Sequence, residues 1–186
     1  MKEIHMCDTY GQYLTMKEEI DEAMQEVIKS TRFIKSGKVL DFEKQLADYL
    51  GTNVIACGNG TDALQIAFMT LGLQPGDEVI TTPFTFISTV EVLALLGLKP
   101  VFADVHPGPF NLNESDIDPL ITGKTKAILP VHLFGQCVNL ESILELARKY
   151  DLFIVEDACQ ALGTEYIFKD GTRKKAGTIG HIGCNS

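Results

Sequence analysis

Hydrophobic positions recur at helical spacing in the first part of the chain. In residues 15–30, TMKEEIDEAMQEVIKS, charged residues separate apolar ones that stand three or four positions apart. Residues 39–50, VLDFEKQLADYL, repeat the pattern, and Gly51 suits the position after a helix end. The pattern predicts two amphipathic helices and indicates that residues 1–51 form a helical N-terminal lead-in.

Beyond residue 51 the pattern changes to short β-rich runs that alternate with helical segments. The β-rich runs lie at 53–57, 78–82, 100–104, 126–131 and 152–156. The helical segments lie at about 61–72, 86–97 and 140–150. Strands that alternate with helices of this length are joined by right-handed crossovers and form a largely parallel sheet with helices on both faces. The sequence therefore predicts an α/β fold for residues 52–186.

Composition and charge narrow the class of protein. Of 186 residues, 45% are hydrophobic, which is enough for one domain with a sizeable core. The chain carries 16 Lys and Arg against 25 Asp and Glu, a formal net charge of −9, without a basic run that could follow a phosphate backbone. It starts without a secretory signal pattern, and its apolar runs fall short of the ~20 residues of a membrane span. We therefore expect a cytoplasmic protein that binds neither nucleic acid nor membrane.

The five cysteines are scattered through the chain without a Cys-x-x-Cys pair. An odd number at irregular spacing is typical of a reducing compartment, where thiols serve as small apolar residues. Together with the four histidines they show no zinc-ligand spacing, so we expect no metal site.

Ligands of parallel α/β sheets bind beyond the carboxyl ends of the strands, so the residues after each predicted strand are candidates for a site. Residues 56–68, ACGNGTDALQIAF, join a strand to a helix through a glycine turn. Gly58 and Gly60 permit a tight turn and a close backbone approach, and the Thr61 hydroxyl can cap the helix. The free N–H groups of such a first turn can bind a phosphate; the alternative is a purely structural turn and cap.

The same segment fits the dinucleotide fingerprint G-x-G-x-x-G/A through Gly58, Gly60 and Ala63, which alone is a weak signal. A nicotinamide dinucleotide also needs an acid at the far end of the next strand. Asp77 and Glu78 precede that strand and so lie at its other end. The sequence therefore disfavours NAD.

Two further strand ends carry aromatic and acidic residues. Phe84 and Phe86, in TTPFTFIST, follow the second β-rich run, where such rings are core residues or stack on a flat cofactor. Glu156 and Asp157 end the run FIVED, either as a surface pair or with one carboxylate facing a permanent positive charge such as a protonated ring nitrogen. A phosphate site, a stacking ring and an acid for a pyridinium nitrogen, all at strand ends of one sheet, together indicate pyridoxal 5′-phosphate.

Six segments of the chain carry a family resemblance. They are GNGTDALQIA, GDEVITTPFTFISTVEVLALLG, KPVFADV, TKAILPVHLFGQ, IVEDACQALG and GHIGCNS. In this order and spacing, over nearly all 186 residues, they resemble the DegT/DnrJ/StrS family of sugar aminotransferases. The resemblance implies the large domain of fold-type I pyridoxal-phosphate transferases, a three-layer α/β/α fold with a mostly parallel sheet, followed by a smaller C-terminal domain. It further implies a homodimer that transfers an amino group from glutamate to a keto-sugar nucleotide in surface polysaccharide or amino-sugar biosynthesis.

The resemblance also implies roles for individual residues. The cofactor contacts are Gly60, Thr61, Asp62 and Ser186 at the phosphate, Phe86 on the ring face, Asp157 at the pyridinium nitrogen and Gln160 at the ring hydroxyl. The role of Asp62 conflicts with its negative charge. A residue with a carboxylate beside a phosphate must contribute through its backbone N–H or point its side chain away. We expect Glu156 to point away from Asp157 into a structural hydrogen bond. His132 and Gln136 follow a neighbouring strand end, where they can line the pocket, and we favour core or supporting positions for them over that role.

Amino transfer requires a lysine that bonds the cofactor as a Schiff base and shuttles a proton. The lysines near the predicted strand ends do not suit that role, because three lie in a polar hairpin predicted to turn at Gly171 and two precede a strand at the wrong end of the sheet. They are Lys169, Lys174 and Lys175, and Lys124 and Lys126. The resemblance places the lysine about five residues beyond Ser186. We therefore predict the N-terminal part of a chain roughly twice as long, incomplete in its large domain, inactive alone and with exposed apolar surface.

Three alternatives remain open. A sugar dehydratase of the same fold replaces the lysine and does not hold the cofactor covalently. A non-catalytic α/β module keeps the fold for binding or assembly. A nicotinamide-dependent oxidoreductase is the least favoured of the three.

Overall fold

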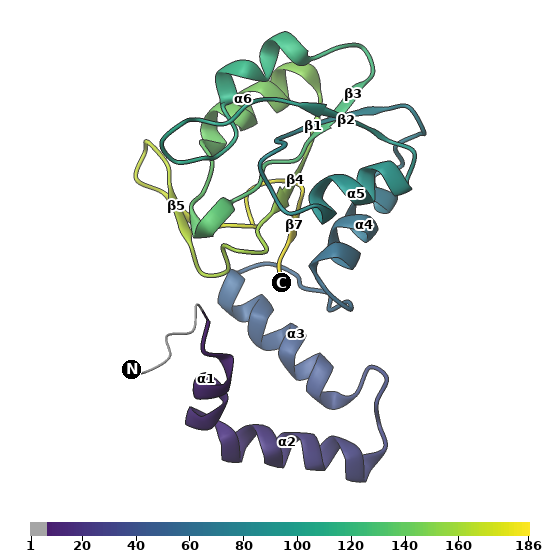
Figure 1. The fold of residues 1–186 in the computed structure, drawn as a ribbon, viewed down its shortest axis with the longest axis vertical. Coiled ribbons are helices and arrows are strands. Elements are labelled where there is room, and N and C mark those ends of the chain that lie inside the picture. Colours follow the sequence, from purple (N-terminus) through teal and green to yellow (C-terminus); the bar gives the residue numbers. More distant parts are fainter. Residues whose placement is uncertain (1–6) are drawn as a thin grey trace, which may run out of the picture. The chain divides into compact units, whose positions relative to one another are not determined.

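The computed structural model describes residues 7–186, and the chain divides into two compact units, Met1–Leu46 and Ala47–Ser186. Figure 1 traces the helices and strands of each unit along the sequence.

The first unit is helical. Asp8 caps α1 (Thr9–Thr15), because its Oδ1 accepts a hydrogen bond of 2.8 Å from the Gly11 N–H. α2 (Lys17–Ser30) ends at Thr31 in the left-handed conformation, and α3 (Gly37–Leu50) starts within this unit. The two predicted amphipathic helices are confirmed as α2 and α3. α1 was not predicted, because a helix of seven residues that includes a glycine is too short to show a period.

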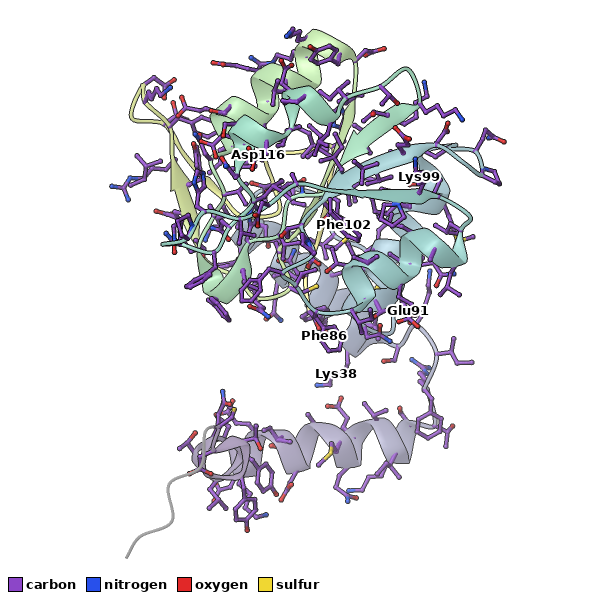
Figure 2. The ribbon with its side chains drawn as sticks, turned by 45° about the horizontal axis from the view of Figure 1, so that its top comes forward. Lys38, Phe86, Glu91, Lys99, Phe102 and Asp116 are labelled. Atoms are coloured by element: carbon purple, nitrogen blue, oxygen red, sulfur yellow. The ribbon has the colours of Figure 1, made fainter. Side chains whose placement is uncertain are left out.

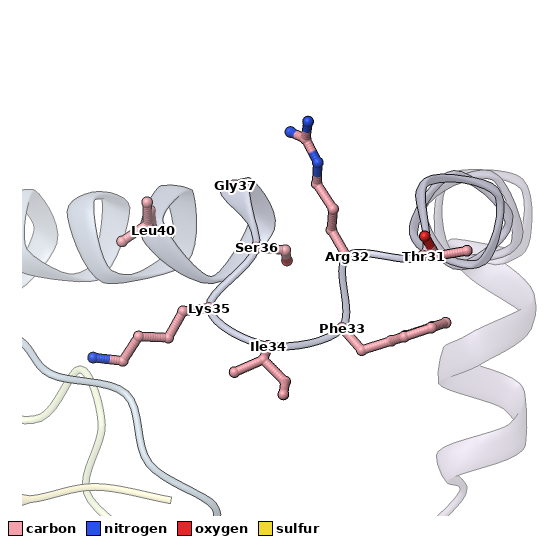
Figure 3. A pocket seen from close by; sticks show the side chains of 8 residues that line it. All are labelled: Thr31, Arg32, Phe33, Ile34, Lys35, Ser36, Gly37 and Leu40. Carbon is pink, nitrogen blue, oxygen red and sulfur yellow. The ribbon is translucent and has the colours of Figure 1, made fainter.

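The loop between α2 and α3 lines a hollow of the first unit, formed by residues 31–37 and Leu40. Figure 3 shows the side chain of Arg32 on one side of this loop and those of Phe33 and Ile34 on the other. Phe33 and Ile34 are 65% and 91% exposed. None of the predicted cofactor contacts lies in this hollow, so it is not the predicted site.

The second unit is a parallel sheet with helices on both faces (Figure 1). Its strands are β1 (Glu78–Thr81), β2 (Lys99–Phe102), β3 (Thr125–Ile128), β4 (Phe153–Asp157) and β7 (Ile182–Cys184), in the spatial order β2-β1-β3-β4-β7. Every pairing in this sheet is parallel. The helices are α4 (Gly60–Thr70), α5 (Ser88–Leu95) and α6 (Leu140–Tyr150), with 3-10 turns at Glu114–Asp116, Asp118–Leu120 and Leu133–Gly135. The predicted three-layer α/β/α fold is confirmed.

Alternation along the strands divides the core into two layers. Val79 and Val155 pack toward α4 and α5, whereas Ile80 and Ile154 pack toward α6. All four side chains are fully buried. Since successive residues of a strand point to opposite faces, a sheet covered on both faces needs strands that are apolar throughout. This explains why the sequences of these strands are continuous apolar runs.

The fifth strand of the sheet is β7, and the predicted strand at 53–57 is wrong. Residues 53–57 form no strand, and Ile55 is 85% exposed. A strand needs a hydrogen-bonded neighbour in a sheet, and the run NVIAC has strand composition but belongs to neither sheet of the described residues. β7 pairs with β4 instead. Sequence reasoning missed β7 because Ile182 is the only β-branched residue in its glycine-rich stretch, GHIGC.

The predicted polar hairpin is confirmed. β5 (Glu165–Ile167) and β6 (Arg173–Lys175) pair antiparallel, and Gly171 turns the chain with a φ of 86°. At its base, the Nζ of Lys175 lies 3.3 Å from the centre of the Tyr49 ring. Lys175 therefore has a local structural partner.

Within residues 7–186, the helices are all too short or too polar to cross a bilayer.

Candidate functional site

A cavity of about 190 Å³ lies at the carboxyl end of the sheet in the second unit. It is lined by six of the seven residues predicted to contact the cofactor, namely Gly60, Thr61, Phe86, Asp157, Gln160 and Ser186. Asp157 is the last residue of β4, and Ser186 follows β7 by two positions. In a parallel sheet the segments that follow the strands open at one edge, which brings these distant residues together.

The first turn of α4 forms one wall of the cavity. Asn59 is its N-cap: the Oδ1 accepts a hydrogen bond of 2.9 Å from the Asp62 N–H, and the carbonyl accepts one of 3.0 Å from the Ala63 N–H. Asn59, not Thr61, therefore caps the helix, which corrects the expected role of the Thr61 hydroxyl. The N–H groups of Gly60 and Thr61 precede the first intrahelical bond and, with the helix dipole, can bind an anion.

Gly60 allows this turn to approach the opposite wall closely. A Cβ at this position would lie 2.6 Å from the Sγ of Cys159 and 2.9 Å from the Cβ of Ser186. A Cβ atom does not make non-bonded contacts this short, so a side chain at this position would push the two walls of the cavity apart. The glycine is needed for close approach rather than for an unusual backbone conformation.

Asp62 is the one predicted cofactor contact that does not line the cavity. The Asn59 Oδ1 already accepts a hydrogen bond from the Asp62 N–H, and the Asn59 Nδ2 donates to the Asp62 Oδ2 at 3.2 Å. The carboxylate folds back over the turn, where it would crowd a Cβ on Gly58. The negative charge thus points away from the place where an anion would bind.

Asp157 is 6% exposed at the cavity wall. Its Oδ2 accepts a hydrogen bond of 2.8 Å from the Thr89 hydroxyl, and its Oδ1 accepts one of 3.3 Å from the Cys159 N–H. Its backbone N–H donates to the Pro130 carbonyl and its carbonyl accepts from the His132 N–H, each at 2.9 Å. Among residues 7–186 no cation pairs with this carboxylate. A buried carboxylate with acceptor capacity left over favours a positive or N–H-donating ligand.

Glu156 points to the other face of β4, as predicted. It is fully buried, and its carboxylate accepts hydrogen bonds from the His132 Nε2 at 2.9 Å and from the N–H groups of Gly177, Ile179 and Gly180 at 2.9, 2.7 and 2.5 Å. Burial raises the pKa of Glu156, but the bonds from His132, Gly180 and Gly177 outweigh it and hold the pKa below its ordinary value. Glu156 therefore anchors the segment that leads into β7.

His132 supports this anchor and does not line the cavity. It is fully buried, and the Val138 N–H donates to its Nδ1 at 3.4 Å. Nδ1 is therefore the acceptor, and Nε2 carries the proton shared with Glu156. Gln136 likewise lies outside the cavity wall, and its carbonyl accepts a hydrogen bond of 2.9 Å from the Asn111 Nδ2. The supporting position expected for His132 is confirmed, whereas Gln136 is exposed and lies neither in the core nor in the cavity wall.

Gln160 presents a hydrogen-bond donor to the cavity. Its Oε1 accepts a hydrogen bond of 2.7 Å from the Phe134 N–H. Phe134 lies in the left-handed region with a φ of 55°, an uncommon conformation that turns this N–H toward Gln160. With its carbonyl engaged, Gln160 keeps its amide hydrogens for a ligand.

Phe84 and Phe86 have different surroundings. Phe86 projects from the loop before α5 and is 69% exposed at the cavity (Figure 2). Phe84 packs its ring against Phe110 with 5.5 Å between the ring centres. An exposed ring at a cavity wall can stack on a flat ligand, so Phe86 is the better placed of the two.

Sequence reasoning missed further residues of the cavity wall, among them Thr85, Thr89 and Cys159. The two threonines stand four positions apart where the loop enters α5, a helical spacing that could have signalled a shared face. Burial raises the pKa of the Cys159 thiol, and the charge of Asp157 raises it further. The thiol is therefore neutral at pH 7 and is not an activated nucleophile.

The groups of the cavity match the parts of one flat, anionic cofactor. N–H groups and hydroxyls at α4 and Ser186 suit a phosphate, and the Phe86 ring suits an aromatic face. The Asp157 carboxylate suits a protonated ring nitrogen, and the Gln160 amide suits a ring hydroxyl. These residues fit pyridoxal phosphate. In the part of the chain that the structure describes, no cluster of His, Cys, Asp and Glu could hold a metal ion.

The fold and the cavity define an α/β protein of the class that binds its ligand at the carboxyl ends of parallel strands. The chain belongs to the DegT/DnrJ/EryC1/StrS aminotransferase family, whose model matches residues 14–186. The family resemblance of the six segments is thereby confirmed.

Known relatives and solved structures agree with this membership. The chain is 41% identical over 184 residues to UDP-2-acetamido-2-deoxy-3-oxo-D-glucuronate aminotransferase of Pseudomonas aeruginosa, with 98% of this chain and 50% of that protein covered. A DegT DnrJ EryC1 StrS aminotransferase from Brucella abortus matches with a TM-score of 0.92 and 38% identity, over 99% of this chain and 50% of that one. The ntda protein of Bacillus subtilis, with bound cofactor PMP, matches with a TM-score of 0.78 and 38% identity, over 80% and 34%. The chain thus spans about half the length of the first two of these proteins and about a third of the last.

Proposed function

We propose that this chain is the cofactor-binding part of a pyridoxal-phosphate-dependent aminotransferase that moves an amino group from glutamate to a keto-sugar nucleotide. The observation that carries the proposal is the convergence of six predicted cofactor contacts on one cavity. Family membership supports the reaction class, and the Pseudomonas relative, an aminotransferase of an oxo-sugar nucleotide by name, supports the acceptor class. When bound, the cofactor supplies an electron sink for the carbon that carries the amino group.

The phosphate end of the cofactor would lie at α4. The N–H groups of Gly60 and Thr61, with the hydroxyls of Thr61 and Ser186, offer donors to its oxygens. Asp62 takes no part through its carboxylate, which is held at Asn59. The helix dipole adds a partial positive charge, so this wall fixes the position of the cofactor without a basic residue.

The ring end would lie between Phe86 and the end of β4. Phe86 would cover one face of the ring and keep water from it. The Asp157 carboxylate would accept the hydrogen bond of the ring nitrogen and hold the proton there. The Gln160 amide, whose Oε1 accepts from the Phe134 N–H, would donate to the ring hydroxyl. Asp157 is the residue on which the electronic function of the cofactor depends.

The lysine needed for the chemistry is not part of this cavity wall. A lysine must bond the cofactor and carry the proton during transfer. We infer that it is supplied by chain outside these 186 residues, in a longer protein that acts in the cytoplasm as a homodimer. The span of about half of the relatives' length supports that inference. By itself the chain would bind the cofactor without a covalent bond and would not transfer amino groups.

The first test uses pyridoxamine 5′-phosphate, which needs no covalent bond to a lysine. The purified chain is titrated with this compound and, separately, with NADH. We expect saturable binding of the first and none of the second. Asp157→Asn, which nearly preserves shape, should lower the affinity about tenfold without loss of folding. Binding of neither compound would favour a non-catalytic module, and wild-type affinity in Asp157→Asn would remove its assigned role.

The second test concerns the reaction and uses a longer protein that contains this segment. Glutamate alone should change the absorbance of the bound cofactor, and a keto-sugar nucleotide from a panel should reverse the change. The absence of a change with any amino donor would point to a dehydratase. Asp157→Ala should reduce the rate of amino transfer by far more than about threefold. A threefold change corresponds to under ~1 kcal/mol of activation free energy. Borohydride should label a lysine outside residues 1–186, and a labelled lysine within them would contradict its placement.

A further inference from the structure

A relay of hydroxyl groups leads to Asp157 from the start of α5. The Thr89 hydroxyl lies 2.8 Å from the Asp157 Oδ2, and the Thr85 hydroxyl lies 2.9 Å from the Thr89 Oγ1. An ionised carboxylate only accepts hydrogen bonds, so Thr89 gives its single hydrogen to Asp157. Thr85 must then be the donor to Thr89. The direction of the relay is fixed from Thr85 through Thr89 to Asp157.

Thr89 is held rigidly enough to orient its partner. It is 1% exposed, and it lies in the first turn of α5, where the backbone and the β-branched side chain both restrict its hydroxyl. The bond joins two elements that are 68 residues apart in sequence. It therefore ties β4, which carries Asp157, to the helix whose preceding loop carries Phe86.

The Thr89 bond is the stronger of the two that hold the Asp157 carboxylate. The other, from the Cys159 N–H to Oδ1, is long at 3.3 Å. The terminal torsion of an aspartate is soft, so the plane of the carboxylate follows the bonds that it makes. Without the Thr89 hydroxyl, the carboxylate can turn within the cavity wall and lose its alignment with a ligand.

We propose that Thr89, backed by Thr85, is the positioning residue that aims the Asp157 carboxylate at the ring nitrogen of the cofactor. The inference rests on the proposed function, because that function names the ligand atom at which Asp157 is aimed. Thr89 itself does not touch the reacting atoms. It fixes the direction of the hydrogen bond that keeps the ring nitrogen protonated.

The test uses the purified chain and pyridoxamine 5′-phosphate labelled with ¹⁵N in the ring. Thr89→Val preserves shape and removes the hydroxyl, Thr89→Ser keeps the hydroxyl, and Thr85→Val removes only the outer donor. The matched control is Thr81→Val. The Thr81 side chain is fully buried and donates a hydrogen bond of 2.8 Å to the Leu129 carbonyl, and Thr81 does not line the cavity. Affinity is measured by titration, and the ring-nitrogen resonance reports protonation.

We expect Thr89→Val to bind about tenfold more weakly and to move the ring-nitrogen resonance toward its unprotonated position. Thr89→Ser should restore both readouts, Thr85→Val should weaken binding by about two- to threefold, and Thr81→Val should change neither. A wild-type resonance and affinity in Thr89→Val would overturn the proposal, as would an equal loss in Thr81→Val. If Thr89→Val does not fold, wild-type behaviour of Thr85→Val overturns it instead.

The outcome for the wild-type chain separates this inference from the proposed function. A wild-type chain that does not bind pyridoxamine 5′-phosphate contradicts the proposed function, and the inference about Thr89 with it. A wild-type chain that binds it with a protonated ring nitrogen, while Thr89→Val does the same, contradicts only the role of Thr89.

Discussion

Glu156 and Asp157 are neighbours in β4, yet their carboxylates serve opposite faces of the strand. Glu156 is enclosed by four donors, His132 and three backbone N–H groups, and has no contact with the cavity. Asp157 has two donors and lines the cavity. The alternation of a strand thus separates a structural carboxylate from one that is available to a ligand.

The first prediction concerns the enclosed carboxylate. Glu156→Gln replaces an oxygen that accepts hydrogen bonds with an amide that faces donors, so it leaves buried groups unpaired. We expect the free energy of unfolding to fall by about 2–4 kcal/mol, measured by urea denaturation. The control is Glu165→Gln, because Glu165 pairs with Arg173 at 3.2 Å on the surface and should contribute under about 1 kcal/mol. Equal effects of the two substitutions would show that Glu156 is not an anchor.

The second prediction concerns acid stability. Hydrogen bonds hold the pKa of Glu156 below its ordinary value of 4.5, against the opposing effect of burial. The hydroxyl of Thr122 and the ammonium of Lys99 do the same for Glu78. A carboxyl whose pKa is lower in the folded state stabilises the fold fully above its unfolded pKa, and this contribution is lost as pH falls through the folded pKa.

The free energy of unfolding should therefore decrease below about pH 4.5, and the decrease should be shallower in Glu156→Gln than in the wild type. The measurement is a series of urea unfolding curves between about pH 7 and pH 3. A wild-type stability that rises on acidification, or identical slopes in the two proteins, would count against the assigned pKa direction.

The third prediction concerns the close approach at Gly60. Gly60→Ala places a Cβ against Cys159 and Ser186, so the walls of the cavity must shift. We expect affinity for pyridoxamine 5′-phosphate to fall at least about tenfold and stability to fall by about 1–3 kcal/mol. Gly123→Ala is the control, because a Cβ there has no neighbour within 4 Å. Unchanged affinity in Gly60→Ala would separate this turn from the phosphate site.

The fourth prediction concerns the exposed ring of Phe86. Because the side chain is 69% exposed, Phe86→Ala should change the free energy of unfolding by under about 0.5 kcal/mol. It should nevertheless weaken binding of pyridoxamine 5′-phosphate about three- to tenfold, since the stacked face is lost, and Phe86→Tyr should retain most of the affinity. Ile87→Ala is the matched control on the same loop, with a side chain that is 64% exposed. An equal loss of affinity in both alanine variants would remove the stacking role.

The sequence by itself determined most of the sheet, the flanking helices and the identity of the candidate site. Apolar runs and helical periods report which faces of a segment are buried, and burial is a local property of each segment. The strands β1 to β4 and the helices α4, α5 and α6 were predicted for this reason. Local pattern singled out the turn at Gly60 and the pair of Glu156 and Asp157, because they stand where a helix begins and where a strand ends. The family resemblance then chose Asp157 of the pair.

Only the tertiary structure decided which segments become neighbours. The run 53–57 has the composition of a strand, but β7 forms the pairing with β4. Asn59 and Thr61 can both cap a helix, and the geometry of the turn selected Asn59. The donors of Glu156 and the bond from Thr89 to Asp157 join residues far apart in sequence. Strand pairing and hydrogen bonds between elements depend on how those elements are placed, and no local period records that placement.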